Sequence, residues 1–139
     1  MRTVAVIGGG HAGDEVVAQL RERGFAGSIT LVEESLHIPY ERPPLSKEFL
    51  TQHLEPSTLA IRGAAFYQQH DTTHRLGVAV VGIDPSESHV KVHFEGGSSE
   101  DYDAIVLATG MQPRKLPVPG AEATGVHYLQ GLTDATALR

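Results

Sequence analysis

Residues 8–13 have the composition and spacing of a phosphate-binding turn. They read Gly8-Gly9-Gly10-His11-Ala12-Gly13 and fit the pattern G-x-G-x-x-G. In this pattern Gly8 makes a tight turn, Gly10 lets a pyrophosphate approach the backbone, and Gly13 lets a helix pack closely on a strand. Free N–H groups at the start of the helix then face the anion. The motif predicts dinucleotide binding by residues 8–13; the alternative is a glycine-rich turn without a ligand.

Two acidic residues complete the pattern. Glu33 and Glu34 stand about 20 residues beyond Gly13, where a dinucleotide-binding fold places a carboxylate that accepts hydrogen bonds from ribose hydroxyls. Either carboxylate would repel a 2′-phosphate, so the expected ligand is an adenosine ribose without one. The alternative is that the two acids are only solvated surface.

The residues around the glycine motif predict the strands and the helix that hold it. Residues 4–7 form a short β-branched run typical of a strand buried on both faces. Apolar residues then recur at helical spacing over 11–23, and Gly24 is a stop signal. Residues 28–32 predict a second strand. The start of the chain is therefore a right-handed βαβ unit with a parallel sheet.

The later part of the chain predicts more strands. Residues 77–84, 88–94 and 103–108 are expected to form a three-strand meander, with turn residues between the runs. The last run is continuously apolar, which indicates that it returns to the central sheet. Residues 45–50 predict a short helix after Pro44. The fold class is α/β.

Composition excludes several kinds of function. The 139 residues carry a formal charge of −6 and no Cys, which argues against nucleic-acid partners and excludes disulfides and thiolate chemistry. His70 and His74 have helical metal-binding spacing but lack a convincing third ligand, so we expect no metal site. The N-terminal apolar run is too short for a signal peptide or a membrane span, so we expect no membrane partner and a cytoplasmic location by default.

Three further stretches are much more selective than the glycine motif. Residues 39–47 read P-Y-E-R-P-P-L-S-K, residues 103–110 read D-A-I-V-L-A-T-G, and residues 116–120 read L-P-V-P-G. Together with the glycine motif they strongly resemble the N-terminal part of the FAD-dependent, NADH-dependent ferredoxin reductases of bacterial oxygenase systems. The resemblance covers essentially the whole chain.

The resemblance implies roles for individual residues. It places Gly8, Gly10, Ala12 and Gly13 on the FAD pyrophosphate. It places Glu34, more than Glu33, on the adenosine ribose, because the family usually has Gly at position 33. Val80 would contact the adenine through its backbone, and Thr109-Gly110 would pass close to the cofactor.

Two cations would lie on the isoalloxazine side. The resemblance places Arg42 and Lys47 there, with Lys47 near the flavin N5 as the catalytic residue. A cation at that position stabilises the negative charge that develops on the flavin as hydride arrives. Gln130 departs from the family, which normally has Arg at this position, so cofactor affinity is expected to be reduced.

The resemblance also implies an organisation and a function. We expect an incomplete Rossmann-like, three-layer FAD-binding domain. Residues 1–110 would form its N-terminal segment, and 111–139 a linker toward a missing NADH-binding domain. The full-length family transfers electrons from NADH through FAD to a ferredoxin-type iron–sulfur protein. Because no second G-x-G-x-x-G occurs, we expect this chain alone to be a truncated piece with little NADH oxidation. The alternatives are a non-catalytic dinucleotide-binding module and an inactive fragment.

Overall fold

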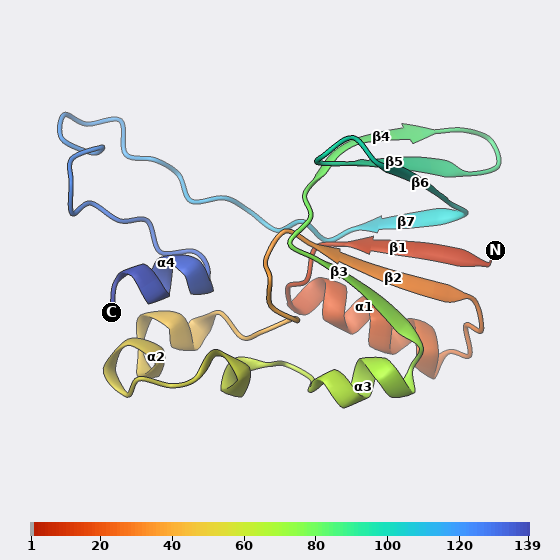
Figure 1. Cartoon of the computed structure of the whole chain (residues 1–139), viewed down its shortest axis with the longest axis horizontal. Helices are drawn as coiled ribbons and strands as arrows, with labels where there is room; N and C mark the ends of the chain where they lie inside the picture. The colour runs from red at the N-terminus through yellow and green to blue at the C-terminus, as the bar shows by residue number, and fades with distance from the viewer. Residues whose placement is uncertain (1) are drawn as a thin grey trace. The chain divides into compact units, whose positions relative to one another are not determined.

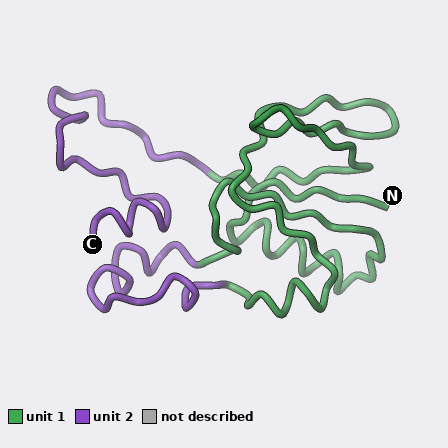
Figure 2. Tube along the Cα trace, in the orientation of Figure 1, with its two compact units in different colours: residues 1–40, 61–110 green, residues 41–60, 111–139 purple. Residues whose placement is uncertain are grey.

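The computed structural model describes residues 2–139. These residues form two compact units, shown in different colours in Figure 2. The first unit runs up to Tyr40 and continues over Ile61–Gly110. The second consists of Glu41–Ala60 and Met111–Arg139.

A four-stranded parallel sheet is the centre of the first unit. It contains β1 (Thr3–Ile7), β2 (Ser28–Glu33), β3 (Thr72–Leu76) and β7 (Ala104–Leu107), in the order β3-β2-β1-β7. The register pairs Ile7 with Val32 on one side and with Leu107 on the other. The predicted βαβ unit is confirmed, and so is the return of the last apolar run to the central sheet. Strand β3 was not predicted, because its sequence T-T-H-R-L lacks a β-branched apolar run.

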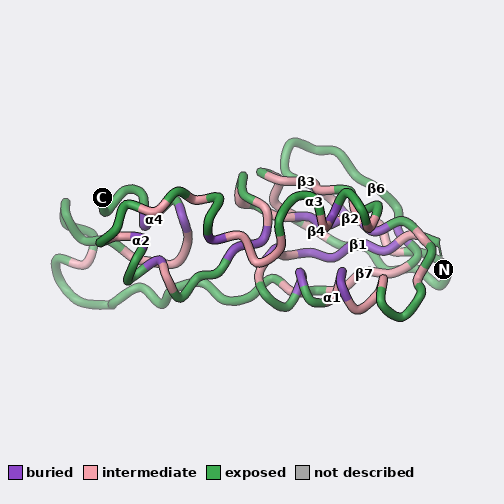
Figure 3. The backbone as a smooth tube through the Cα atoms, turned by 90° about the horizontal axis from the view of Figure 1, so that it is seen from below, coloured by how far each residue is buried: buried purple, intermediate pink, exposed green. Residues whose placement is uncertain are grey.

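Helices cover one face of this sheet. Helix α1 (His11–Glu22) follows the glycine turn, and the shorter α3 (Ala64–Gln69) precedes β3 (Figure 1). The cluster of buried residues on this face consists of Val4, Val6, Val17, Ile29, Leu31 and Tyr67. Figure 3 shows the buried stretches running through β1 and β2 and along the inner side of α1. The period of the apolar residues in α1 places Val17 and Ala18 against the sheet.

A three-stranded antiparallel meander covers the other face. It consists of β4 (Val80–Pro85), β5 (Val90–Phe94) and β6 (Ser99–Tyr102) (Figure 1). Its buried residues pack against Ala5, Ile7 and Val32 of the parallel sheet. The prediction that residues 103–108 supply the third strand was wrong, because 99–102 do so. The chain turns at Asp103, whose carboxylate accepts hydrogen bonds from the backbone N–H groups of Arg2 and Thr3. The three layers are thus helices, parallel sheet and meander.

The second unit is built from short helical segments. These are the 3₁₀ helices η1 (Pro43–Ser46) and η2 (Pro56–Leu59) and the α-helices α2 (Glu48–Thr51) and α4 (Leu132–Ala137). The helix predicted over 45–50 is present as η1 and α2, which are divided at Lys47. Helix α4 was not predicted. No helix within residues 2–139 is both long enough and apolar enough to cross a membrane.

Candidate functional site

The turn after β1 is built so that Gly8 cannot be replaced. Its N–H donates a hydrogen bond of 2.8 Å to the carbonyl of Val32, and its φ is +111°. A Cβ at this position would lie 2.2 Å from the carbonyl oxygen of Ala108. Positive φ and close backbone approach both require glycine here. The absence of a side chain at Gly8 therefore allows the ends of β1, β2 and β7 to lie close together.

Gly13 has a packing role of the same kind. A Cβ on Gly13 would lie 1.9 Å from the carbonyl oxygen of Gly8. The first turn of α1 therefore rests directly on the glycine turn, with no room for a side chain between them. The helical hydrogen bonds begin where Asp14 N–H donates to the carbonyl of Gly10, at 3.0 Å.

Gly10 differs from both. Its φ of −82° and ψ of −174° are extended values that any residue adopts, and a Cβ built on it would meet nothing within 4 Å. Neither backbone conformation nor packing within the described residues explains why this position is glycine. His11 and Ala12, which follow it at the start of α1, are exposed. The open space beside Gly10 and the helix N-terminus fits a pyrophosphate, which would need the backbone to be bare at this position.

Glu33 is the acidic residue that the structure brings to this turn. Its Oε2 accepts a hydrogen bond from Gly9 N–H, and its Oε1 accepts one of 3.0 Å from Ser35 N–H. The side chain is half-buried at the end of β2, whereas Glu34 is exposed. The sequence alone left the two carboxylates as alternatives, and only Glu33 contacts the glycine motif in this structure.

A buried carboxylate lies one residue beyond the motif. Asp14 is 1% exposed and accepts a hydrogen bond of 2.5 Å from the hydroxyl of Tyr67. The Arg62 guanidinium donates a hydrogen bond to the Asp14 carboxylate through Nη1. Through Nη2 it donates one of 3.0 Å to the Glu15 carboxylate. Burial raises the pKa of Tyr67 to about 12. Sequence reasoning missed this cluster, although the position of Asp14 on the same helical face as Val17 was a signal.

Other predicted residues in the first unit have definite places. The backbone N of Thr109 lies 3.0 Å from the position of a Cβ on Gly8, so the Thr109-Gly110 segment runs beside the glycine turn. Val80 is half-buried and packs on the apolar cluster under the meander. Residues 8–13, Glu33 and Thr109 are therefore brought together.

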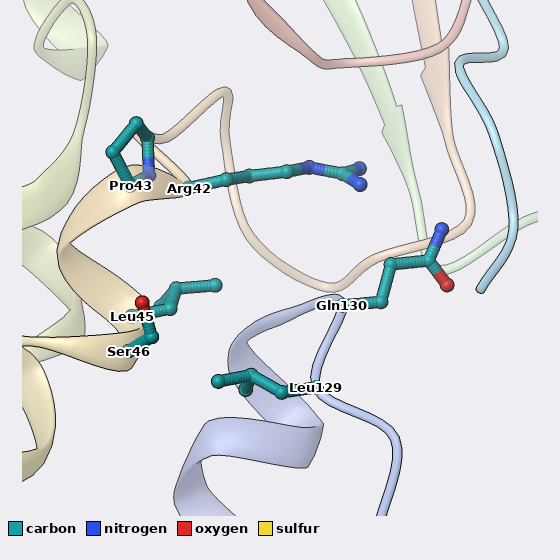
Figure 4. Close-up of a pocket in the computed structure, with 6 residues that line it drawn as sticks. All are labelled: Arg42, Pro43, Leu45, Ser46, Leu129 and Gln130. Atoms are coloured by element: carbon teal, nitrogen blue, oxygen red, sulfur yellow. The ribbon is translucent and has the colours of Figure 1, made fainter.

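Arg42 and Lys47 belong to the second unit, and both are exposed. Arg42 lines a pocket of about 290 Å³, together with Pro43, Leu45, Ser46, Leu129 and Gln130 (Figure 4). The side chains of Arg42 and Gln130 extend toward the same side of this pocket. The amide of Gln130 also donates a hydrogen bond to the carbonyl of Met111. Lys47 is not among the residues that line the pocket.

His70 and His74 do not share a helix. His70 follows the end of α3, and His74 lies in β3. The Nε2 atom of His74 is buried without a hydrogen-bond partner, and its ring packs edge-on against Tyr67 with 4.4 Å between centroids. Burial lowers the pKa of His74 below its ordinary value. Over residues 2–139 the structure shows no group of three His, Cys, Asp or Glu side chains that could hold a metal ion.

Comparison with known proteins gives one consistent result. Residues 2–139 match the family described as pyridine nucleotide-disulphide oxidoreductase. The chain is 41% identical over 136 residues to rhodocoxin reductase of Rhodococcus erythropolis, covering 98% of this chain and 31% of that protein. It is 42% identical over 136 residues to the ferredoxin–NAD(+) reductase component of the p-cumate 2,3-dioxygenase system of Pseudomonas putida, covering 98% and 33%.

Solved structures agree with this result. A ferredoxin reductase from Rhodopseudomonas palustris superposes with a TM-score of 0.90 at 36% identity, over 99% of this chain and 33% of that one. The reductase in a covalent putidaredoxin reductase–putidaredoxin complex gives a TM-score of 0.84 at 35% identity, covering 99% and 33%. The chain spans about a third of the length of these relatives.

Proposed function

The chain belongs to the pyridine nucleotide-disulphide oxidoreductase family, and from that premise we propose that its glycine turn binds the pyrophosphate of FAD. Membership of this family implies FAD and NADH as cofactors. The observation that carries the proposal is the open space at Gly10, where glycine has no structural explanation other than a ligand that approaches the backbone.

Several residues would hold the cofactor. Gly8, Gly10, Ala12 and Gly13 would offer bare backbone to the pyrophosphate, and His11 lies in the same helical turn. A carboxylate at the end of β2 would accept the ribose hydroxyls. The backbone of Val80 would contact the adenine, and Thr109 and Gly110 would pass close to the cofactor, as the resemblance implies.

The flavin side of the proposal rests on the second unit. FAD, when bound, accepts a hydride and releases single electrons. Arg42 and Lys47 would supply positive charge, with Lys47 as the catalytic cation that stabilises a negatively charged flavin. Both side chains are exposed and available to a ligand.

We extend the proposal to the longer protein that the relatives represent. Residues 1–110 would be the first segment of an FAD-binding domain, and 111–139 would lead toward an NADH-binding domain. The complete protein would transfer electrons from NADH through FAD to a ferredoxin-type iron–sulfur protein of an oxygenase system. Support comes from the relatives named as ferredoxin reductases and from the complex with putidaredoxin. A cytoplasmic location is part of the same proposal.

The experiment is a titration of the purified 139-residue chain with FAD, followed by flavin fluorescence and by calorimetry. We expect saturable binding to the parent chain and at least a tenfold loss in Gly10→Ala, since a methyl group would occupy the approach of the pyrophosphate. The melting temperature of Gly10→Ala without ligand should match that of the parent, because the added Cβ meets nothing.

Two other outcomes of the titration would contradict FAD binding. Binding of NADH or ADP-ribose in place of FAD would favour a non-catalytic dinucleotide module. If a folded chain bound none of these ligands, the proposal would be wrong.

A further inference from the structure

Helix α1 contains two adjacent carboxylates immediately after the glycine motif: Asp14 lies in its first turn, and Glu15 is the next residue. Asp14 is fully buried, whereas the Glu15 side chain is about half exposed, at 55%. A carboxylate here interacts favourably with the positive end of the helix dipole. It also repels any phosphate that approaches the same helix end, since like charges interact strongly at short range inside a protein.

Arg62 forms ion pairs with both carboxylates. It lies outside α1, at the start of the segment that leads into α3, yet its guanidinium reaches Asp14 and Glu15 at once. The guanidinium also stacks over the ring of Phe66, with 5.1 Å between Cζ and the ring centroid. Its side chain is only 28% exposed, so water weakens this pairing less than it would at an open surface.

The cluster therefore has a defined charge. With Tyr67 neutral, because its pKa is about 12, Asp14, Glu15 and Arg62 together leave one net negative charge. Without Arg62 there would be two negative charges beside the turn, one of them buried and unpaired. Without the charge of Asp14, the cluster would be neutral.

We propose that Arg62 is a positioning residue for the pyrophosphate: by neutralising Asp14 inside the first turn of α1, it keeps that helix end attractive to phosphate. This inference rests on the proposed function, since it concerns the same glycine turn. It assigns Asp14 and Arg62 a part in setting affinity for the anionic portion of the ligand. Affinity for the adenosine portion should be independent of the pair.

The test is a charge cycle measured with ADP and with adenosine. The variants are Asp14→Asn, Arg62→Met and the double variant, each titrated by calorimetry at low and at high salt. We expect Asp14→Asn to bind ADP roughly three- to tenfold more tightly and Arg62→Met to bind it roughly three- to tenfold more weakly. The double variant should return close to the parent, and adenosine affinity should stay constant throughout.

A purely structural role gives a different pattern. Asp14→Asn would then weaken both ligands, or change neither, and salt would have no effect on the differences between variants; either result overturns the inference alone. If Arg62→Met fails to fold, Asp14→Asn and the double variant still distinguish the two roles. Only the charge argument predicts that Asp14→Asn gains ADP affinity and that this gain disappears in the double variant. A folded parent chain that binds neither ADP nor FAD would overturn the proposed function, and this inference with it.

Discussion

The carboxylate of Glu33 accepts a hydrogen bond from the backbone N–H of Gly9, although the two residues are 24 positions apart in the chain. The contact exists because the carboxyl ends of neighbouring parallel strands meet at one edge of the sheet. It also makes the two positions dependent on each other. A Cβ on Gly9 would lie 2.8 Å from Glu33 Oε2, so a side chain at position 9 would displace that carboxylate.

This relationship predicts which acid matters for the ligand. We expect Glu33→Ala to weaken FAD binding roughly tenfold, since hydrogen bonds to a charged group contribute about 1.5–3 kcal/mol. The matched variant Glu34→Ala removes an exposed side chain and should have a smaller effect. Titration of both variants with FAD measures the difference. A larger loss in Glu34→Ala would instead restore the assignment that the family resemblance implies.

The glycines of the turn should separate into two classes when stability is measured. Gly13→Ala places a Cβ 1.9 Å from the carbonyl oxygen of Gly8, and overpacking of this kind costs about 1–3 kcal/mol. Urea unfolding should show this loss for Gly13→Ala. Gly10→Ala should have the same unfolding midpoint as the parent, within error, because its Cβ meets nothing. Equal losses of stability in the two variants would contradict the interpretation that position 10 is glycine because a ligand approaches its backbone.

His74 should make the fold sensitive to acid. Burial lowers its pKa below the ordinary value of 6.5, so the unfolded chain binds a proton before the folded chain does. Stability is therefore unaffected by this group well above pH 6.5 and decreases as the pH falls below it. Urea unfolding between pH 7.5 and 5.5 should show a smaller decrease for His74→Phe than for the parent. The exposed control His127→Gln should follow the parent curve.

Substitution of Gln130 tests whether the pocket in the second unit contributes to FAD binding. It lines the same pocket as Arg42, and the family resemblance implies an Arg at this position. We expect Gln130→Arg to strengthen FAD binding several-fold, since a second guanidinium in that pocket would attract an anionic cofactor. The control Gln130→Lys should give a smaller gain, because Lys lacks the planar, bidentate geometry. No gain in either variant would show that this pocket does not face the cofactor.

The first βαβ unit, the glycine motif and the family could all be predicted from the amino-acid sequence alone. These features are local, because a β-branched run, three close glycines and a helical apolar period each leave a mark within a few residues. The selective string at 39–47 carried the resemblance for the same reason. The meander was predicted, with its third strand misplaced onto the residues that became β7.

Which side chains contact one another could not be predicted without the folded structure. Glu33 and not Glu34 contacts the turn because strand register, rather than spacing, sets which side chain faces Gly9. Strand β3 forms because β2 is already there to pair with it, whatever the propensity of its own sequence. Asp14 and Arg62 are 48 positions apart, and no local pattern links them. Their pairing is a property of the packed helix layer, where a buried charge must find its partner from another segment.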